Sequence, residues 1–182
     1  MAEIILVTGG ARSGKSSFAE KLALKISDGQ AAYIATAQIF DDEMAYRVKL
    51  HKARRKKNWA NYDAPFDAEK LFPAVSEKVI LFDSVTMYLT NWLLTKNLDD
   101  ENIFTEFENF INSLIAAAKN SRATVIFVSD EVGAGIVPEN KLARVFRDML
   151  GIANQKIAAE SSKVFLTVAG LAVDIKKLAE KI

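Results

Sequence analysis

A glycine-rich segment close to the start of the chain limits the possible folds more than any other feature. It follows the apolar run Ile4 to Thr8 and reads Gly9-Gly10-Ala11-Arg12-Ser13-Gly14-Lys15-Ser16. This matches the G-x-x-x-x-G-K-[ST] pattern of a phosphate-binding loop, in which a strand precedes the glycines and a helix follows them. Backbone amides in such a loop point at phosphate oxygens, and the helix N-terminus adds partial positive charge. The segment therefore predicts a site for a nucleoside triphosphate, GTP or ATP.

Two side chains at the end of this loop have expected roles. Lys15 is expected to reach the β- and γ-phosphates as a catalytic residue, and the hydroxyl of Ser16 is expected to bind Mg²⁺. The alternative is a glycine-rich turn that binds nothing. That alternative is disfavoured because the pattern occurs together with its strand-loop-helix context.

Short apolar runs alternate with longer amphipathic stretches along the rest of the chain. This alternation predicts an α/β fold of the P-loop NTPase type, with a mostly parallel central sheet flanked by helices. The expected strands are Ile4 to Thr8, Ala31 to Ala35, Val79 to Phe82, Thr124 to Ser129 and Lys163 to Val168. The expected helices are Lys15 to Ser27, Asp41 to Lys57, Thr86 to Thr95, Glu101 to Lys119 and Glu139 to Ser161, with Gly151 a candidate break in the last.

Composition narrows the function classes. The 182 residues are 50% hydrophobic, which suits one domain over residues 1–182 rather than two. A formal net charge of +1 gives no overall attraction to nucleic acid or to a membrane surface. The chain has no cysteine, so disulfides and thiolate metal sites are excluded. The first residues form a strand rather than a cleavable signal, and the apolar runs are too short to span a bilayer, so we expect a cytoplasmic protein.

Two of the expected strands end in acidic residues. Asp83 ends the third strand, and Asp130 and Glu131 end the fourth. Phosphate-loop enzymes place a carboxylate at the end of a neighbouring buried strand, where it holds Mg²⁺ directly or through water. Asp83 is the cleaner match and is predicted as a metal ligand beside Ser16, with Asp130 or Glu131 as a second candidate. The alternative for each is a strand-end turn or a helix cap, where Asp is common.

The single histidine, His51, lies in a segment rich in lysine and arginine. At helical spacing Arg47, Arg54 and Arg55 are its near neighbours, and these cations would keep the imidazole neutral and nucleophilic. A neutral imidazole can attack phosphorus, while neighbouring cations stabilise charge on phosphoryl oxygens. From spacing alone, however, a solvated helix face with an ordinary surface histidine is favoured. A nucleic-acid patch is a further alternative, which the near-neutral overall charge opposes.

Five blocks of sequence resemble one known family. In chain order they are Thr8 to Ser16, Tyr33 to Gln38, Asp41 to Met44, His51-Lys52 and Glu131 to Asn140, and they run over almost the whole chain. Together they look like the bifunctional adenosylcobinamide kinase and adenosylcobinamide-phosphate guanylyltransferase of cobalamin biosynthesis. The last block is the most distinctive, because many unrelated NTPases share the phosphate loop.

The resemblance implies two reactions at overlapping sites. In the first, the aminopropanol hydroxyl of adenosylcobinamide takes the γ-phosphoryl group of ATP or GTP. In the second, a histidine attacks the α-phosphate of GTP, releases pyrophosphate and carries GMP as a phosphoramidate. The substrate phosphate then attacks this intermediate, which gives adenosylcobinamide-GDP. His51 stands in the place of the family's nucleophile, so the resemblance reverses the assignment that spacing alone favours.

The resemblance also implies further nucleotide contacts. They are Ala35, Thr36 and Ala37 after the second strand, Lys52, Ala53, Arg54 and Arg55 after the nucleophile, and the acidic residues Asp63 and Asp83. Asp63 and Asp83 stand where the family has Glu, and Leu50 stands where some members have a second histidine. One imidazole suffices to form the phosphoramidate. Family members are trimers, so we expect a homotrimer. The expected substrates are adenosylcobinamide and its phosphate. The near-neutral charge leads us to expect no nucleic-acid partner.

Two other functions stay open at this point. The chain could be a kinase only, acting on the same corrinoid or another alcohol, with His51 idle. It could also be an NTP-driven switch or nucleic-acid motor, although such motors usually need a larger body and a broader basic groove than one cationic helix offers.

Overall fold

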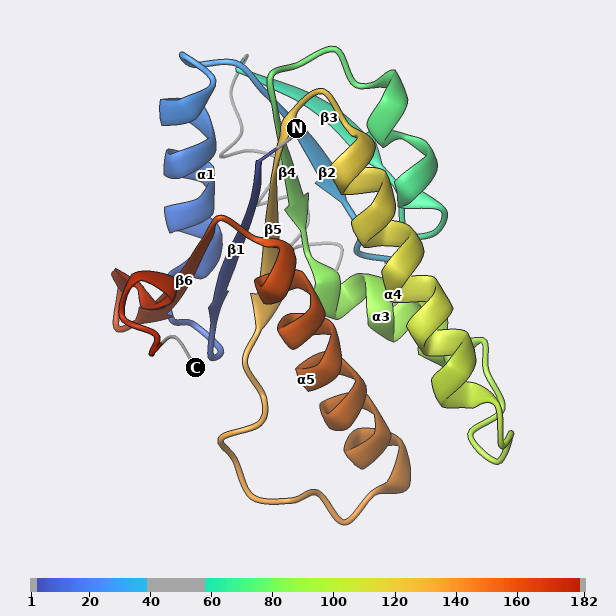
Figure 1. The fold of residues 1–182 in the computed structure, drawn as a ribbon. Coiled ribbons are helices and arrows are strands. Elements are labelled where there is room, and N and C mark those ends of the chain that lie inside the picture. The colour runs from blue at the N-terminus through green and yellow to red at the C-terminus, as the bar shows by residue number, and fades with distance from the viewer. Residues whose placement is uncertain (1–2, 39–57, 181–182) are drawn as a thin grey trace.

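A seven-stranded sheet forms the centre of the computed structural model, in the order β3-β2-β4-β5-β1-β6-β7. The structure describes residues 3–38 and 58–180 (Figure 1). Neighbouring strands run parallel except for β6 and β7, which are antiparallel. The strands are β1 (Ile4–Gly9), β2 (Ala31–Ala35), β3 (Trp59–Asp63), β4 (Val79–Asp83), β5 (Thr124–Asp130), β6 (Lys163–Val168) and β7 (Leu171–Asp174). The predicted mostly parallel α/β fold is confirmed.

Helices cover both faces of this sheet. The α-helices are α1 (Lys15–Ile26), α3 (Val85–Leu94), α4 (Ile103–Asn120) and α5 (Lys141–Glu160), and the short 3₁₀ helices are η1 (Ala68–Lys70), η2 (Phe72–Ala74) and η3 (Ile175–Lys177). Figure 1 shows α1 on one face and α3, α4 and α5 on the other. In the ranges 3–38 and 58–180, none of the helices combines the length and the apolar composition that crossing a bilayer requires.

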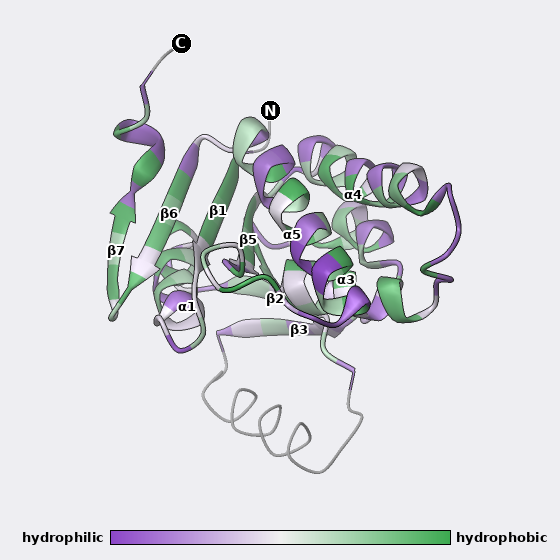
Figure 2. Cartoon of the chain, turned by 90° about the horizontal axis from the view of Figure 1, so that it is seen from below, coloured by the Kyte–Doolittle hydropathy of each residue, from purple (hydrophilic) through white to green (hydrophobic). Residues whose placement is uncertain are grey.

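The central strands are apolar throughout because both of their faces are buried. Leu6 of β1 packs in the cluster formed with α3, α4 and α5, whereas Val7 packs on the other face with Ala19 and Ala23 of α1. Figure 2 shows green, hydrophobic strands at the centre of the sheet and helices that carry both green and purple residues. The two-sided core fixes the strand register, since a shift by one residue would exchange the faces.

Two strands escape sequence-based prediction, and both lie at an edge of the sheet. β3 reads WANYD and alternates between half-buried and exposed residues, so it lacks the apolar run of a central strand. β7 has four residues and returns antiparallel to β6 through a turn in which Ala169 and Gly170 have φ values of 51° and 81°. Edge strands need less apolar content because one side faces solvent or a covering segment.

The predicted break at Gly151 is wrong. Helix α5 continues through this residue, because Met149, Leu150 and Ala153 on either side are fully buried and tie both halves to the core. The helix begins at Lys141 rather than Glu139, since the Asn140 side chain accepts a hydrogen bond from Ala143 N at 3.0 Å and caps it. The predicted helix over residues 41–57 lies outside the described residues.

Candidate active site

The carboxyl ends of the parallel strands gather the predicted site residues along one edge of the sheet. Gly9, which begins the phosphate loop, pairs with Asp130 at the end of β5. Ala35 at the end of β2 pairs with Asp83 of β4 on one side and with Asp63 of β3 on the other. Ligands of open α/β sheets bind outside the carboxyl ends of the strands. The sheet therefore places the loop and three carboxylates at the edge where a nucleotide is expected.

Two glycines let the phosphate loop pass close to β6 and the turn that follows it. A Cβ atom on Gly9 would lie 2.4 Å from both the carbonyl oxygen and the Oγ1 atom of Thr167. Gly14, at the N-cap of α1, has a φ of 97°, and a Cβ atom there would meet the Cα of Gly170 at 3.2 Å. The fixed glycines of the motif are thus required by packing within the protein as well as by approach of a phosphate.

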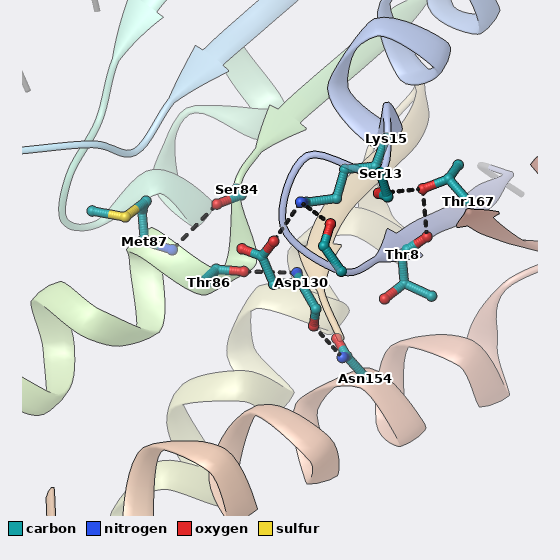
Figure 3. A network of polar contacts seen from close by, with 10 residues as sticks. Thr8, Ser13, Lys15, Ser84, Thr86, Met87, Asp130, Asn154 and Thr167 are labelled. Carbon is teal, nitrogen blue, oxygen red and sulfur yellow. Dashed lines mark hydrogen bonds and ion pairs between the residues drawn. The ribbon is translucent and has the colours of Figure 1, made fainter. Parts of the chain in front are cut away.

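Hydrogen bonds link the phosphate loop to β1, to β6 and to the turn after β6 (Figure 3). The hydroxyl groups of Ser13 and Thr167 are 2.8 Å apart, and Thr167 Oγ1 also donates to Thr8 O at 3.1 Å. Gly170 N donates to Ser13 O at 2.9 Å. Both hydroxyl-bearing side chains are buried, so loss of either would leave a polar partner unpaired. The loop is therefore preorganised before any ligand binds.

Lys15 folds back over the phosphate loop. Its Nζ atom donates to Gly10 O at 3.2 Å and forms an ion pair with the carboxylate of Asp130 (Figure 3). The Lys15 side chain is only 13% exposed, so the ion pair neutralises a partly buried cation. A bound triphosphate would offer the same ammonium group a stronger set of anionic oxygens.

Neighbouring elements fix the backbone of Asp130 on both sides. Its N–H donates to Thr86 Oγ1 of α3 at 2.8 Å, and its carbonyl accepts from Asn154 Nδ2 of α5 at 3.0 Å (Figure 3). Glu131 is used differently, because its carboxylate accepts hydrogen bonds from Gly133 N at 2.8 Å and Ala134 N at 3.3 Å. Of the two acidic candidates at the tip of β5, Asp130 faces Lys15 and Glu131 shapes the following loop.

Asp83 occupies the end of β4, which β5 separates from β1. Its Oδ2 atom accepts a 2.7 Å hydrogen bond from the hydroxyl of Tyr33 on β2. Asp63 lies at the end of β3 and is exposed. Asp83 and Asp63 therefore share the edge with the phosphate loop, whereas direct contact with Lys15 is made by Asp130.

The segment after β2 is held by buried polar contacts. Thr36 is fully buried; its Oγ1 atom donates to Ser84 O and accepts from Ser84 N, each at 2.8 Å. Asn91 Nδ2 of α3 donates to Thr36 O at 2.7 Å. The half-buried Ala35 and Ala37 flank this fixed residue. Thr36 thus has a structural role, and a nucleotide contact of Ala35, Thr36 or Ala37 stays a prediction.

Some of the remaining predicted residues lie in or next to the phosphate loop, and the others lie outside the described residues. Gly10, Ala11 and Arg12 are exposed at the loop surface, and Ser16 is half-buried in the first turn of α1. The positions of these residues agree with a phosphate-binding loop. The following residues lie outside the described residues: His51, Lys52, Ala53, Arg54 and Arg55.

Three residues that make these contacts receive no predicted role from the sequence motifs. Thr167 lies at the end of the strand beside β1, Asn154 lies in the middle of α5, and Tyr33 lies within β2. Each acts on a residue far away in the sequence, so only the strand order reveals the contact. A polar residue near the carboxyl end of an otherwise apolar strand, as at Thr167, is the one available hint.

No group of three or more His, Cys, Asp or Glu side chains that could hold a metal ion occurs within residues 3–38 and 58–180. A Mg²⁺ ion at a nucleotide site is usually held by one or two side-chain oxygens and completed by phosphates and water. The oxygen donors of Ser16 and Asp83 suit such a site.

Comparisons with a family model and with three curated proteins all point to one family. The model of the family described as cobinamide kinase / cobinamide phosphate guanyltransferase (CobU) matches residues 5–175. The bifunctional adenosylcobalamin biosynthesis protein CobU of Escherichia coli K12 is 44% identical, and the match covers 95% of this chain and 99% of the relative. CobU of Salmonella typhimurium LT2 is 43% identical, with coverages of 95% and 99%. The bifunctional protein CobP of Pseudomonas aeruginosa PAO1 is 38% identical, with coverages of 94% and 96%.

The family match over residues 5–175 spans the phosphate loop, the acidic strand ends and the loop after β5. The predicted resemblance and the predicted class of enzyme, a kinase combined with a guanylyltransferase, are confirmed. The chain belongs to the family of cobinamide kinases and cobinamide phosphate guanyltransferases.

Proposed function

We propose that this enzyme phosphorylates the aminopropanol hydroxyl of adenosylcobinamide with ATP or GTP and then transfers GMP from GTP to the new phosphate. His51 carries the GMP between the two substrates. Family membership supports both activities, and the preorganised phosphate loop supports the use of a triphosphate. The observation that carries the proposal is the position of Lys15, whose Nζ atom donates to Gly10 O of the phosphate loop and pairs with Asp130 at the carboxyl edge of the sheet.

In the kinase step the residues of this chain position the triphosphate. Loop amides bind the β- and γ-phosphates, and Lys15 exchanges Asp130 for phosphate oxygens. The hydroxyl oxygen of the acceptor attacks the γ-phosphorus while the bond to the β–γ bridging oxygen breaks. When bound, Mg²⁺ neutralises developing phosphate charge, and we assign it to Ser16 directly and to Asp83 directly or through water.

In the transfer step His51 forms a phosphorus–nitrogen bond with the α-phosphorus of GTP, and pyrophosphate leaves. An oxygen of the substrate phosphate then attacks the same phosphorus and the bond to nitrogen breaks, which releases adenosylcobinamide-GDP and free His51. Lys52, Arg54 and Arg55 stabilise charge on the phosphoryl oxygens in this scheme. The family resemblance supports the homotrimer and the roles of the following residues: His51, Lys52, Ala53, Arg54, Arg55 and Asp63.

Labelled nucleotide tests the two steps together. Protein incubated with GTP labelled at the α-phosphate is expected to acquire acid-labile label, whereas GTP labelled at the γ-phosphate leaves none. His51→Ala should abolish the label and keep phosphorylation of adenosylcobinamide. Lys15→Ala should lose both activities.

A wild-type protein that phosphorylates the corrinoid and never takes up α-label would be a kinase only. Label that persists in His51→Ala would place the nucleophile elsewhere. Nucleotide hydrolysis that DNA or RNA accelerates, with no response to the corrinoid, would favour a motor or switch instead.

A further inference from the structure

An apolar pocket lies between the second half of α3 and the first turns of α5. Its volume is about 250 Å³, and its walls are formed by Thr90, Leu93 and Leu94 of α3 and by Leu142, Ala143 and Phe146 of α5. Small-molecule sites that enclose a whole ligand usually have about 300–1,000 Å³. This pocket therefore fits one part of a large ligand rather than a complete one.

A chain of contacts links the pocket to the phosphate loop. Thr90 Oγ1 donates to Thr86 O at 2.8 Å, and Thr86 Oγ1 accepts from Asp130 N at 2.8 Å. Asp130 in turn pairs with Lys15 (Figure 3). Thr90 lies four positions after Thr86, which is about 6 Å along the helix axis. The pocket thus begins about one turn of α3 beyond Thr86, the residue that contacts Asp130 at the carboxyl edge of the sheet.

The lining of the pocket selects for hydrocarbon surface. Its two polar side chains are already engaged with helix backbone, Thr90 with Thr86 O and Asn140 with Ala143 N. None of the pocket residues carries a charge, so a triphosphate has no partner there. Burial of apolar area is the main stabilisation that such a lining offers.

Exposed apolar side chains also occur on the loop between β5 and α5, residues 131–140, which ends at the pocket. Ile136 is 97% exposed and Val137 is 63% exposed, and Leu94 at the pocket wall is 56% exposed. The loop begins at Glu131, next to Asp130, and ends at Asn140, which also lines the pocket. Exposed apolar side chains that are grouped together mark a binding site, whereas single ones are common on any protein surface.

We propose that this pocket binds an apolar, methyl-bearing edge of the corrin ring of the acceptor substrate. The proposal rests on the proposed kinase function and assigns part of the acceptor site. The ring edge fills the space between α3 and α5, and the hydroxyl arm extends along α3 toward Lys15. Leu94 at the pocket wall lies about 12 Å along α3 from Thr86, so a ligand that fills the pocket and also reaches the phosphate loop has to be as large as a macrocycle.

Substitutions at the pocket wall test the assignment through corrinoid binding. Leu94→Glu places a charge at the exposed wall, and Ala143→Leu fills the pocket without a charge. Each variant is expected to raise the Kd for adenosylcobinamide, measured by equilibrium dialysis without nucleotide, by about tenfold, which corresponds to about 1.4 kcal/mol. The KM for the corrinoid in the kinase reaction should rise by the same factor, while kcat at saturation stays within about twofold of the wild type.

Leu178→Glu is the matched control, because Leu178 is also an exposed leucine (72%) and lies just after η3. It should leave the corrinoid Kd unchanged. Thermal unfolding of all three variants checks that the fold is retained. A wild-type Kd in both pocket variants would overturn the proposal, as would a change of the oligomeric mass by light scattering in Leu94→Glu, which would make this face a contact between copies.

Uptake of α-label from GTP alone separates this proposal from the proposed function. Guanylylation needs no corrinoid, so both pocket variants should label like the wild type. Normal labelling with unchanged corrinoid binding removes the pocket assignment alone. Absence of labelling in the wild-type protein removes the proposed transfer step, and corrinoid binding still decides the pocket.

Discussion

The phosphate loop and the loop between β5 and α5 start from adjacent strands and differ in how they are held. The phosphate loop is tied to β1 and β6 by buried side chains, through Ser13 and Thr167. The β5–α5 loop is exposed over most of its length and is shaped by Glu131 and by Arg147, which donates to Gly133 O at 2.5 Å. The first holds a fixed geometry for a phosphate. The second presents apolar side chains to a larger partner, so changes in the two loops should affect different substrates.

Gly9→Ala should have the largest effect, because the new Cβ would lie 2.4 Å from two atoms of Thr167. The loop must move, so we expect a loss of about 1–3 kcal/mol in the free energy of unfolding and a loss of GTP binding by at least about a hundredfold. Gly10→Ala is the matched control, since nothing lies within 4 Å of its Cβ position. Urea unfolding and calorimetric titration with GTP measure both. Equal behaviour of the two variants would contradict the proposed packing role.

Thr167→Val should have the next effect. It keeps the shape of the side chain and leaves Ser13 Oγ and Thr8 O without their buried partner. The expected loss in unfolding free energy is about 1–3 kcal/mol, with GTP affinity lowered several-fold. Thr167→Ser restores the hydroxyl and should recover GTP affinity. If valine and serine bind GTP equally well, preorganisation of the loop does not depend on this hydrogen bond.

Asp130→Asn should have a smaller effect of opposite sign. The carboxylate competes with phosphate for Lys15, so its neutralisation should tighten GTP binding by about three- to tenfold. The backbone contacts to Thr86 and Asn154 do not involve the side chain and should persist. Calorimetric titration gives the answer. Weaker binding in the variant would show that Asp130 supports the nucleotide or its metal ion.

Glu131→Gln should have the smallest effect, and that effect should be limited to the loop between β5 and α5. The amide oxygen still accepts from Gly133 N, but the charge-assisted bonds become ordinary ones. We expect faster hydrogen exchange over residues 131–140, a corrinoid KM raised by about two- to threefold, and an unchanged Kd for GTP. A change confined to GTP would reverse the division of roles between the two loops.

Much of this site can be predicted from the sequence, because its central part is local. The glycines, Lys15 and Ser16 lie within eight consecutive residues, and the apolar run before them identifies the strand. Asp83 and Asp130 are recognisable as acidic ends of buried strands. Local patterns of this kind do not depend on how the chain folds over larger distances.

The contacts that fix the site depend on strand order, which the sequence pattern does not specify. Ser13 and Thr167 are 154 positions apart and meet because β6 lies beside β1. The pairing of Lys15 with Asp130 rather than Asp83 follows from β5 standing between β1 and β4. β3 escapes prediction because an edge strand needs no continuous apolar run, and β7 escapes it because the strand has only four residues. The role of His51 rests on family resemblance, since spacing alone favours a surface histidine.

Mass spectrometry of protein incubated with GTP and Mg²⁺ shows whether His51 carries the GMP. We expect one GMP per chain, attached to the peptide that contains His51 and removed by mild acid. The adduct should be absent from His51→Ala and from Gly9→Ala, since one variant lacks the nucleophile and the other the phosphate loop. An adduct on another residue, or an unmodified chain that still converts adenosylcobinamide phosphate to its GDP form, would contradict it.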